Sequence, residues 1–225
     1  MVKDGNSSGP VEIEAGRVTL KGDLTIPKGA GGLVLFAHGS GSGRHSPRNR
    51  FVAGELNKRG IATLLFDLLT EEEEVEDMAS AQLRFNIPML TKRLAGATEW
   101  ALANPKTSKL KIGYFGASTG AAAAIMAAAE KPKAVAAVVS RGGRPDLAAE
   151  VLPTIRCPIL LIVGGDDEMV IELNRLAFEK IKSERKKLLI VAGATHLFEE
   201  KGKLEEVAQY ACEWFLQYLG GAKGR

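Results

Sequence analysis

Short apolar runs alternate with stretches of helical periodicity through most of this 225-residue chain. The apolar runs lie at residues 33–37, 61–66, 110–115, 134–139, 159–163 and 187–191. The helical stretches lie between or after them, at residues 51–59, 118–131, 169–183 and 204–219. Apolar runs of this length, separated by helices, are typical of a parallel sheet that is buried on both faces. The pattern therefore predicts an α/β fold with helices on both faces of the sheet.

The segment before residue 33 alternates between apolar and polar residues instead. This alternation occupies residues 11–15 and 18–26. It predicts an antiparallel hairpin at the N-terminal edge of the sheet. With the hairpin included, we expect about eight strands, most of them parallel.

No repeat, linker or change of composition divides the chain. We therefore expect one domain over residues 11–219, with flexible tails at residues 1–10 and 220–225. The formal charge is only +3, from 30 basic and 27 acidic residues, so no nucleic-acid partner is expected. No apolar run approaches the roughly 20 residues that span a bilayer. Two cysteines are too few for a disulfide framework. These features predict a cytoplasmic protein without a membrane partner.

Two segments interrupt the alternation. Residues 70–78 contain four consecutive glutamates, and we expect a solvated loop there that leads into a helix. Residues 79–103 have helical character but contain Pro88, which removes a backbone hydrogen bond from a helix interior. The segment is therefore expected to form either two helices that meet at Pro88 or one kinked helix.

The segment from Gly116 to Gly120 has the pattern Gly-x-Ser-x-Gly and directly follows an apolar run. A serine on a tight turn between strand and helix has a strained backbone, and the flanking glycines relieve crowding where the strand and the helix pass. The turn projects the hydroxyl group of Ser118 out of the sheet. The N-terminus of the helix that follows favours a developing negative charge. This context predicts Ser118 as a nucleophile.

A serine hydroxyl group needs a base to remove its proton, and the chain has three histidines. His196 follows the last apolar run, so it belongs to a loop at the same edge of a parallel sheet as Ser118. We therefore predict His196 as the base. The base in turn needs an acid beside it. Asp166, Asp167 and Glu168 follow another apolar run, and position alone does not choose among them.

A glycine-rich stretch at residues 38–43 follows the apolar run at residues 33–37. Such a loop turns backbone N–H groups towards an oxyanion, and we expect the amides of Ser40 and Thr119 to form that oxyanion hole. A phosphate-binding loop is the alternative, but its Gly-x-x-x-x-Gly-Lys-Ser/Thr pattern is absent from the chain. The glycines also have the wrong spacing for a dinucleotide-binding loop.

Together these motifs resemble those of the α/β-hydrolases, and most closely those of the dienelactone-hydrolase-like branch. The resemblance extends from the hairpin to the last helix. It rests on His-Gly-Ser-Gly at residues 38–41, Gly-Ala-Ser-Thr-Gly at 116–120, Gly-x-x-Asp-x-x-Val at 164–170 and Gly-Ala-Thr-His at 193–196. The acid of that family stands at the fourth position of the third motif. The resemblance therefore implies an α/β-hydrolase domain with a catalytic triad of Ser118, Asp167 and His196.

Position 118 is serine, whereas enzymes that open dienelactones typically use cysteine as the nucleophile. This difference favours a serine hydrolase that acts on carboxylic esters through an acyl-enzyme intermediate. The alternatives are another acyl transfer on the same residues, as in a thioesterase, peptidase or acyltransferase, and a non-catalytic binding protein with the same fold. The histidines and cysteines lack the spacing of a zinc site, so no metal and no cofactor is expected.

A group of basic residues suggests how a substrate is bound. Four basic residues follow the glycine-rich loop closely: Arg44, His45, Arg48 and Arg50. We predict that they form a lip that binds an anionic substrate. Arg141 and Arg144, which follow another apolar run, could extend this lip.

Residues 78–94 form the apolar segment best placed to roof the site. Phe85 and Met89 belong to it and are predicted to contact the substrate. Only about twenty residues separate the runs at residues 134–139 and 159–163, which leaves no room for the large lid of a lipase. We therefore expect a small-molecule ester with a short acyl chain as the substrate.

The expected assembly is a monomer or a homodimer.

Overall fold

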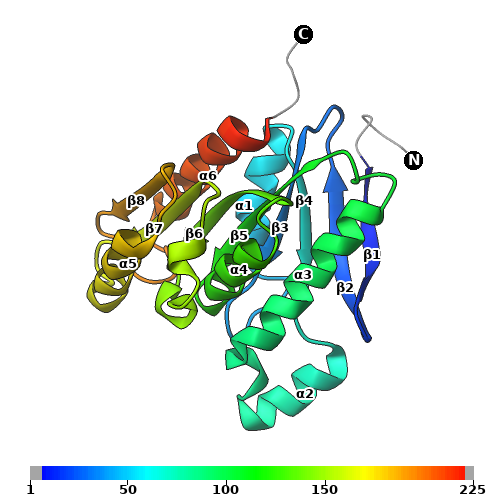
Figure 1. Cartoon of the computed structure of the whole chain (residues 1–225), viewed down its shortest axis with the longest axis horizontal. Coiled ribbons are helices and arrows are strands. Elements are labelled where there is room, and N and C mark those ends of the chain that lie inside the picture. The colour runs from blue at the N-terminus through cyan, green and yellow to red at the C-terminus, as the bar shows by residue number, and fades with distance from the viewer. Residues whose placement is uncertain (1–6, 221–225) are drawn as a thin grey trace.

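One eight-stranded sheet runs through the molecule in the order β1-β2-β4-β3-β5-β6-β7-β8 (Figure 1). The computed structural model describes residues 7–220. The strands are β1 (Ser7–Ala15), β2 (Val18–Ile26), β3 (Gly32–Ala37), β4 (Ala62–Phe66), β5 (Lys111–Ala117), β6 (Val135–Arg141), β7 (Ile159–Gly164) and β8 (Lys186–Val191). β1 and β2 pair antiparallel with their neighbours, and β3 to β8 run parallel to one another. The predicted fold class is therefore confirmed.

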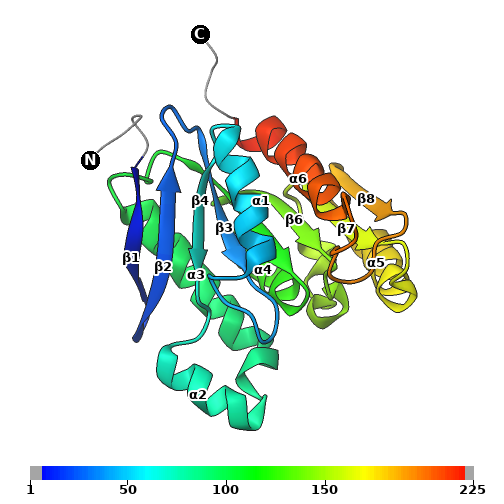
Figure 2. The same ribbon diagram turned by 180° about the vertical axis from the view of Figure 1, so that it is seen from behind.

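Helices cover both faces of this sheet (Figures 1 and 2). They are α1 (Pro47–Lys58), α2 (Glu71–Ser80), α3 (Ile87–Ala103), α4 (Thr119–Glu130), α5 (Glu168–Lys180) and α6 (Lys203–Leu219), with the short 3₁₀ helices η1 (Leu83–Phe85), η2 (Pro145–Ala148) and η3 (Leu152–Thr154). Helices α1 and α6 lie on one face, and α3, α4 and α5 lie on the other. Within residues 7–220, no helix is long and apolar enough to cross a membrane.

Each face of the sheet has its own apolar core, because successive side chains of a strand point to opposite faces. In β3, Leu33 and Leu35 are buried on the side of α3 and α4. Val34 and Phe36 are buried on the side of α1 and α6. The short apolar runs of the sequence are thus strands buried on both faces.

The N-terminal strand is longer than the sequence predicts. β1 begins at Ser7 rather than at residue 11, because residues 7–10 pair with residues 23–26 of β2. Residues 7–10 therefore belong to the sheet and not to a flexible tail. Residues 1–6 and 221–225, the remainder of the predicted tails apart from Gly220, lie outside the described residues.

The acidic segment forms helix α2, so the prediction of a loop over residues 70–78 is wrong. Thr70 Oγ1 accepts a hydrogen bond from the amide of Glu73 at 3.2 Å, and Glu73 Oε2 accepts one from the amide of Thr70 at 2.9 Å. This reciprocal pair is a capping box, and acids in the first turn interact favourably with the helix dipole. Pro88 stands in the first turn of α3, where it costs no helical hydrogen bond. Residues 79–103 contain the end of α2, the short η1 and then α3, so a new helix begins beside Pro88 and the segment is not one kinked helix.

Candidate active site

Ser118 occupies the turn between β5 and α4 with a backbone conformation that is rare for any residue with a side chain. Its φ is 51° and its ψ is −121°. A Cβ atom on Gly116 would lie 2.5 Å from the Cα of Ala121, and one on Gly120 would overlap the carbonyl oxygen of Ala37. Only glycine fits at either position. The Ser118 side chain makes no capping hydrogen bond to α4, so its hydroxyl group is not used to begin the helix.

His196 and Asp167 meet although 29 positions separate them in the chain. Asp167 follows β7 and His196 follows β8, and these strands are parallel neighbours, so both loops leave the same edge of the sheet. His196 Nδ1 lies 2.6 Å from Asp167 Oδ2. Of the three consecutive acids after β7, Asp167 is the partly buried one, while Asp166 and Glu168 are exposed. A carboxylate at Nδ1 orients the imidazole and leaves Nε2 available for proton transfer.

A pocket of about 170 Å³ brings Ser118 and His196 together. Its other walls include Ser40 and Asn49 from the first loop and helix, and Arg141 at the end of β6. Among the described residues no direct hydrogen bond joins Ser118 to His196; such bonds are often long in the absence of substrate. The loops after β3, β5, β6 and β8 therefore converge on one small space.

The predicted oxyanion donors lie beside this pocket, but one of them is already engaged. The amide of Ser40 donates to Thr119 Oγ1 at 3.1 Å, and the hydroxyl groups of the two residues lie 2.9 Å apart. Thr119 opens helix α4, where the first backbone N–H groups have no acceptor within the helix. The Thr119 hydroxyl group thus holds the glycine-rich loop against α4, a contact that the sequence motifs do not predict.

His38 is excluded as the base by its own hydrogen bonds. The ring is buried, Nδ1 lies 3.0 Å from the carbonyl oxygen of Gly39, and Nε2 accepts from the amide of Leu68 at 3.0 Å. An amide can only donate, so Nε2 carries no proton and Nδ1 donates to Gly39. Burial lowers the pKa of His38 below its ordinary value. His38 therefore ties the loop after β3 to the loop after β4 as a neutral ring.

Three of the basic residues after the glycine-rich loop, Arg44, Arg48 and Arg50, are paired with acids, so the predicted anion-binding lip is not a cluster of unpaired cations. Arg44 bonds Asp67 through both its guanidinium group and its backbone amide. His45 Nδ1 lies 2.7 Å from Arg50 Nη2. The remaining ion pairs of this region are Arg48–Glu199, Arg50–Asp23 and Arg144–Asp146.

A larger cavity of about 480 Å³ lies between the glycine-rich loop and α2. Met78 and Leu90 line it, so part of the segment at residues 78–94 does face this region. Phe85 and Met89 do not line it: Phe85 is 57% exposed on η1, and Met89 packs half-buried against the core. One residue of α3 corresponds to a turn of about 100°, which gives Leu90 and Met89 different surroundings.

The described residues contain no group of three or more His, Cys, Asp or Glu side chains that could hold a metal ion. Both cysteines are free thiols, and burial raises their pKa to about 11. Neither Cys157 nor Cys212 lines the pocket that contains Ser118.

The mostly parallel sheet, the strained serine after β5, and the histidine loop beside it define an α/β-hydrolase fold. The chain belongs to the dienelactone hydrolase family, whose family model matches residues 26–219. It is 57% identical to a dienelactone hydrolase from Anabaena variabilis, whose crystal structure has a TM-score of 0.94 with this chain, over 96% of this chain and 99% of that one. The fold and the family are those of a hydrolase.

Two further comparisons describe the breadth of this relationship. Putative phosphoribosyl transferases of Mycobacterium tuberculosis are 53% identical over 211 residues, which are 94% of this chain but only 46% of theirs. The chain thus spans about half the length of the curated relatives that it matches. Est1E from Butyrivibrio proteoclasticus is 18% identical with a TM-score of 0.78, over 93% of this chain and 98% of that one. At that identity the likeness concerns the fold alone.

Proposed function

We propose that this protein is a serine hydrolase of carboxylic esters in which Ser118 is the nucleophile, His196 the base and Asp167 the orienting acid. The observation that carries the proposal is the 2.6 Å contact between His196 Nδ1 and Asp167 Oδ2, at a histidine that shares a pocket with Ser118. A strained serine is costly for a fold to keep, by about 1–3 kcal/mol. A role in catalysis accounts for that cost.

The reaction proceeds in two acyl transfers. Ser118 Oγ attacks the ester carbonyl carbon while its proton passes to His196 Nε2. The resulting oxyanion accepts hydrogen bonds from the amides of Thr119 and Ser40. The amide of Ser40 now donates to Thr119 Oγ1, so that hydrogen bond must break first. His196 then protonates the leaving alcohol, and the acyl group stays on Ser118. Water, deprotonated by His196, releases the carboxylic acid.

The first test compares the wild-type protein with Ser118→Ala on a short p-nitrophenyl ester. We expect hydrolysis to fall by at least about 10³-fold in the variant, because both acyl transfers need the hydroxyl group. Ser108→Ala, at an exposed serine beyond the end of α3, is the matched control and should keep wild-type activity. Equal turnover in all three proteins would refute the assignment of the nucleophile.

The size of the pocket at Ser118 supports short acyl chains as the preferred substrates. A space of about 170 Å³ accommodates only a small group. In a series of p-nitrophenyl esters, kcat/KM should therefore be highest at roughly two to four acyl carbons, because a small pocket discriminates against longer chains. Fastest turnover of long-chain esters would contradict this part of the proposal.

The same residues would serve a thioesterase, a peptidase or an acyltransferase, and a binding protein could keep them without turnover. Reaction with a fluorophosphonate separates the last case, because only an activated serine is modified rapidly. The name of the mycobacterial relatives describes chains about twice as long as the shared segment, so phosphoribosyl transfer is not carried over to this chain. A cytoplasmic location and a monomeric or dimeric assembly stay predictions.

A further inference from the structure

Arg141 is a buried guanidinium group without an acceptor. Its side chain is 6% exposed, and no hydrogen bond or ion pair holds it within residues 7–220; its Nε is sealed from solvent and unpartnered. A guanidinium group has five N–H donors and stays charged at neutral pH. A buried charge is normally paired, because leaving water is costly. Arg141 therefore differs from Arg44 and Arg144, each of which has an acid partner.

The position of Arg141 connects it to the proposed chemistry. It is the last residue of β6, and its carbonyl oxygen accepts from the amide of Ser118 at 3.2 Å. Its side chain lines the 170 Å³ pocket together with Ser118 and His196. At the next residue, a Cβ atom on Gly142 would lie 3.4 Å from Cε1 of His196. Arg141 thus reaches the space beside the reacting groups and not a remote surface.

The guanidinium group of Arg141 packs on the ring of Phe198, an aromatic residue with a strained backbone. Arg141 Cζ lies 5.9 Å from the ring centroid of Phe198, a favourable cation–π distance. Phe198 is fully buried and has a φ of 59°, which is unusual for a bulky residue. The fold therefore tolerates backbone strain at Phe198 where its ring meets Arg141.

The pocket carries excess positive charge. Arg48 also lines it, and its Nε is likewise buried without a partner, although its Nη1 lies 2.5 Å from Glu199. Asp167, the partly buried acid after β7, is engaged by His196. Burial, with a smaller effect of Arg48, lowers the pKa of Arg141 to about 10, so the group is still charged at neutral pH. Of the two arginines, only Arg48 has an acid partner, and that partner is the exposed Glu199.

We propose that Arg141, assisted by Arg48, is an anion subsite that binds a carboxylate or phosphate group carried by the ester substrate. The proposal rests on the proposed ester hydrolysis for the identity of the neighbouring reaction, but not for the binding itself. The guanidinium fork offers paired N–H donors to two oxygens of either group. The volume of about 170 Å³ restricts the anionic group to a position a few bonds from the scissile carbonyl.

Anion binding is measured directly in the Ser118→Ala background, where no turnover interferes. Inorganic phosphate and acetate are the two probes, and the thermal unfolding midpoint is followed as each is added. We expect at least one probe to raise the midpoint of this protein. Adding Arg141→Met should lower the affinity for that probe by roughly ten- to hundredfold, because charge-assisted hydrogen bonds are lost. Arg175→Met, at an exposed arginine of α5, removes the same charge and should leave binding unchanged.

The probes also identify the source of the anion, since a response to phosphate alone indicates a phosphorylated substrate and a response to acetate indicates a carboxylate. Without any probe, Arg141→Met should unfold at the same or a higher temperature, because it removes an unpaired buried charge. Arg141→Lys keeps the charge without the fork and decides the matter if the methionine variant does not fold. Absence of binding by both probes, or equal binding after Arg141→Met, would overturn the proposal.

The second arm uses activity with Ser118 present. The substrates are p-nitrophenyl hydrogen succinate, which is anionic, and its methyl ester, which is neutral. Arg141→Met should lower the ratio of kcat/KM for the anionic over the neutral ester by roughly ten- to hundredfold. An unchanged ratio contradicts the subsite even if both esters are good substrates. No hydrolysis of either ester by the wild-type protein would defeat the proposed function, while the binding experiment would still decide on Arg141.

Discussion

Ser118 shows how a single residue can be held in an unfavourable conformation by its neighbours. Its positive φ costs about 1–3 kcal/mol, and nothing in its own side chain offsets that cost through a helix cap. The turn is maintained because β5 and α4 are both deeply buried and leave no room for another path. Gly116 and Gly120 make this close approach possible.

Gly120→Ala should therefore destabilise the fold by about 3 kcal/mol, as an overpacked core position does. The new Cβ atom would overlap the carbonyl oxygens of Ala37 and His38, which are backbone atoms and cannot move freely. Gly54→Ala, within α1, is the matched control, because its Cβ atom would meet nothing within 4 Å. That control should gain about 1 kcal/mol from helix propensity. Denaturant midpoints measure both, and equal effects of the two changes would contradict the packing argument.

His38 links stability to pH because it is buried as a neutral ring. Its pKa lies below the ordinary value of 6.5, with burial as the main cause. As the pH falls through 6.5 the unfolded chain takes up a proton that the folded protein does not, so the unfolded state gains stability. The contribution of His38 is therefore fully favourable above that pH and declines below it.

This reasoning predicts the behaviour of His38→Gln. The wild-type protein should lose more stability than the variant between about pH 7.5 and pH 5.5, because only the wild type has this buried imidazole. The measurement is the denaturant midpoint at both pH values. His45→Gln, at an exposed histidine, should behave like the wild type. The same pH dependence in all three proteins would show that His38 is not responsible.

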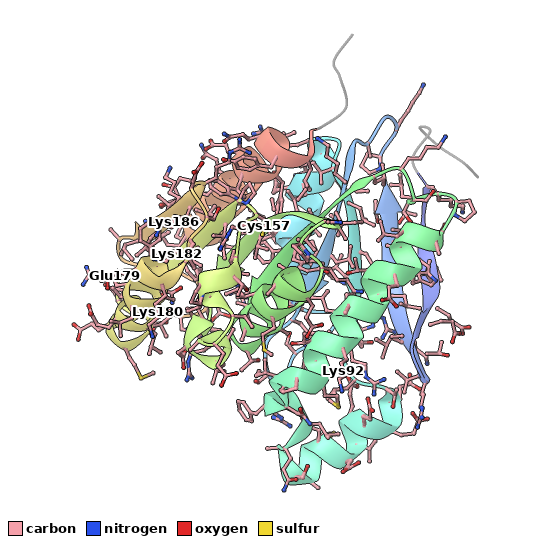
Figure 3. All side chains as sticks on the ribbon, in the orientation of Figure 1. Lys92, Cys157, Glu179, Lys180, Lys182 and Lys186 are labelled. Carbon is pink, nitrogen blue, oxygen red and sulfur yellow. The ribbon has the colours of Figure 1, made fainter. Side chains whose placement is uncertain are left out.

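The C-terminus of helix α5 is capped by a side chain from another element. Its C-terminal carbonyl groups would lack partners, but Lys186 of the next strand donates from Nζ to the oxygens of Phe178 and Ile181 at 2.7 and 2.8 Å. Nζ also lies 4.6 Å from the centroid of the Phe178 ring. Figure 3 shows Lys186 and Lys182 at the α5–β8 end of the molecule. The cation thus meets the negative end of the helix dipole.

Lys186→Met keeps an apolar side chain of similar length over Phe178 but removes both hydrogen bonds. We expect a loss of about 1–2 kcal/mol in the free energy of unfolding. Lys182→Met, at an exposed lysine of the loop that follows α5, should change stability by less than about 0.5 kcal/mol. Activity should be unchanged in both, since neither lysine lines the pocket at Ser118. A loss of the same size in both variants would argue against the capping role.

The sequence around α2 contains two local signals that indicate different structures. The pattern Thr70-x-x-Glu73 is a capping-box signal for a helix, whereas the run of glutamates is typical of a solvated loop. Few apolar residues mark a buried face there, and Val75 and Met78 are 70% and 81% exposed. Hydrophobic periodicity therefore does not indicate a helix in this segment, whereas the capping box does. Pro88, by contrast, correctly indicated a helix boundary.

The whole sheet explains why distant segments of the chain meet. Strands β3 to β8 are parallel, so the loops after β3, β5, β7 and β8 leave from the same edge and bring together residues from 38 to 196. Two apolar cores, one on each face, hold this edge in place. Precise placement of polar groups is thus a consequence of packing far from them.

Much of this architecture follows from local pattern. Short apolar runs, an alternating N-terminal segment and a Gly-x-Ser-x-Gly turn are sufficient to indicate a mostly parallel sheet and a serine at its edge, because periodicity and backbone sterics act over a few residues. The order of Ser118, the acids after β7, and His196 is likewise visible in the chain.

The partners of the charged groups cannot be predicted from local pattern, because ion pairs join residues that are far apart in the chain. Arg44 and Arg141 have the same side chain, yet one bonds Asp67 across the sheet edge and the other is buried beside Ser118 without an acid. Asp167 and Asp166 are adjacent, yet only Asp167 contacts His196. Burial and pairing depend on how separate elements pack, and the free energy of a charge depends on both. The sequence therefore specifies the sheet and the serine turn, while packing in three dimensions selects the charges that remain available to a substrate.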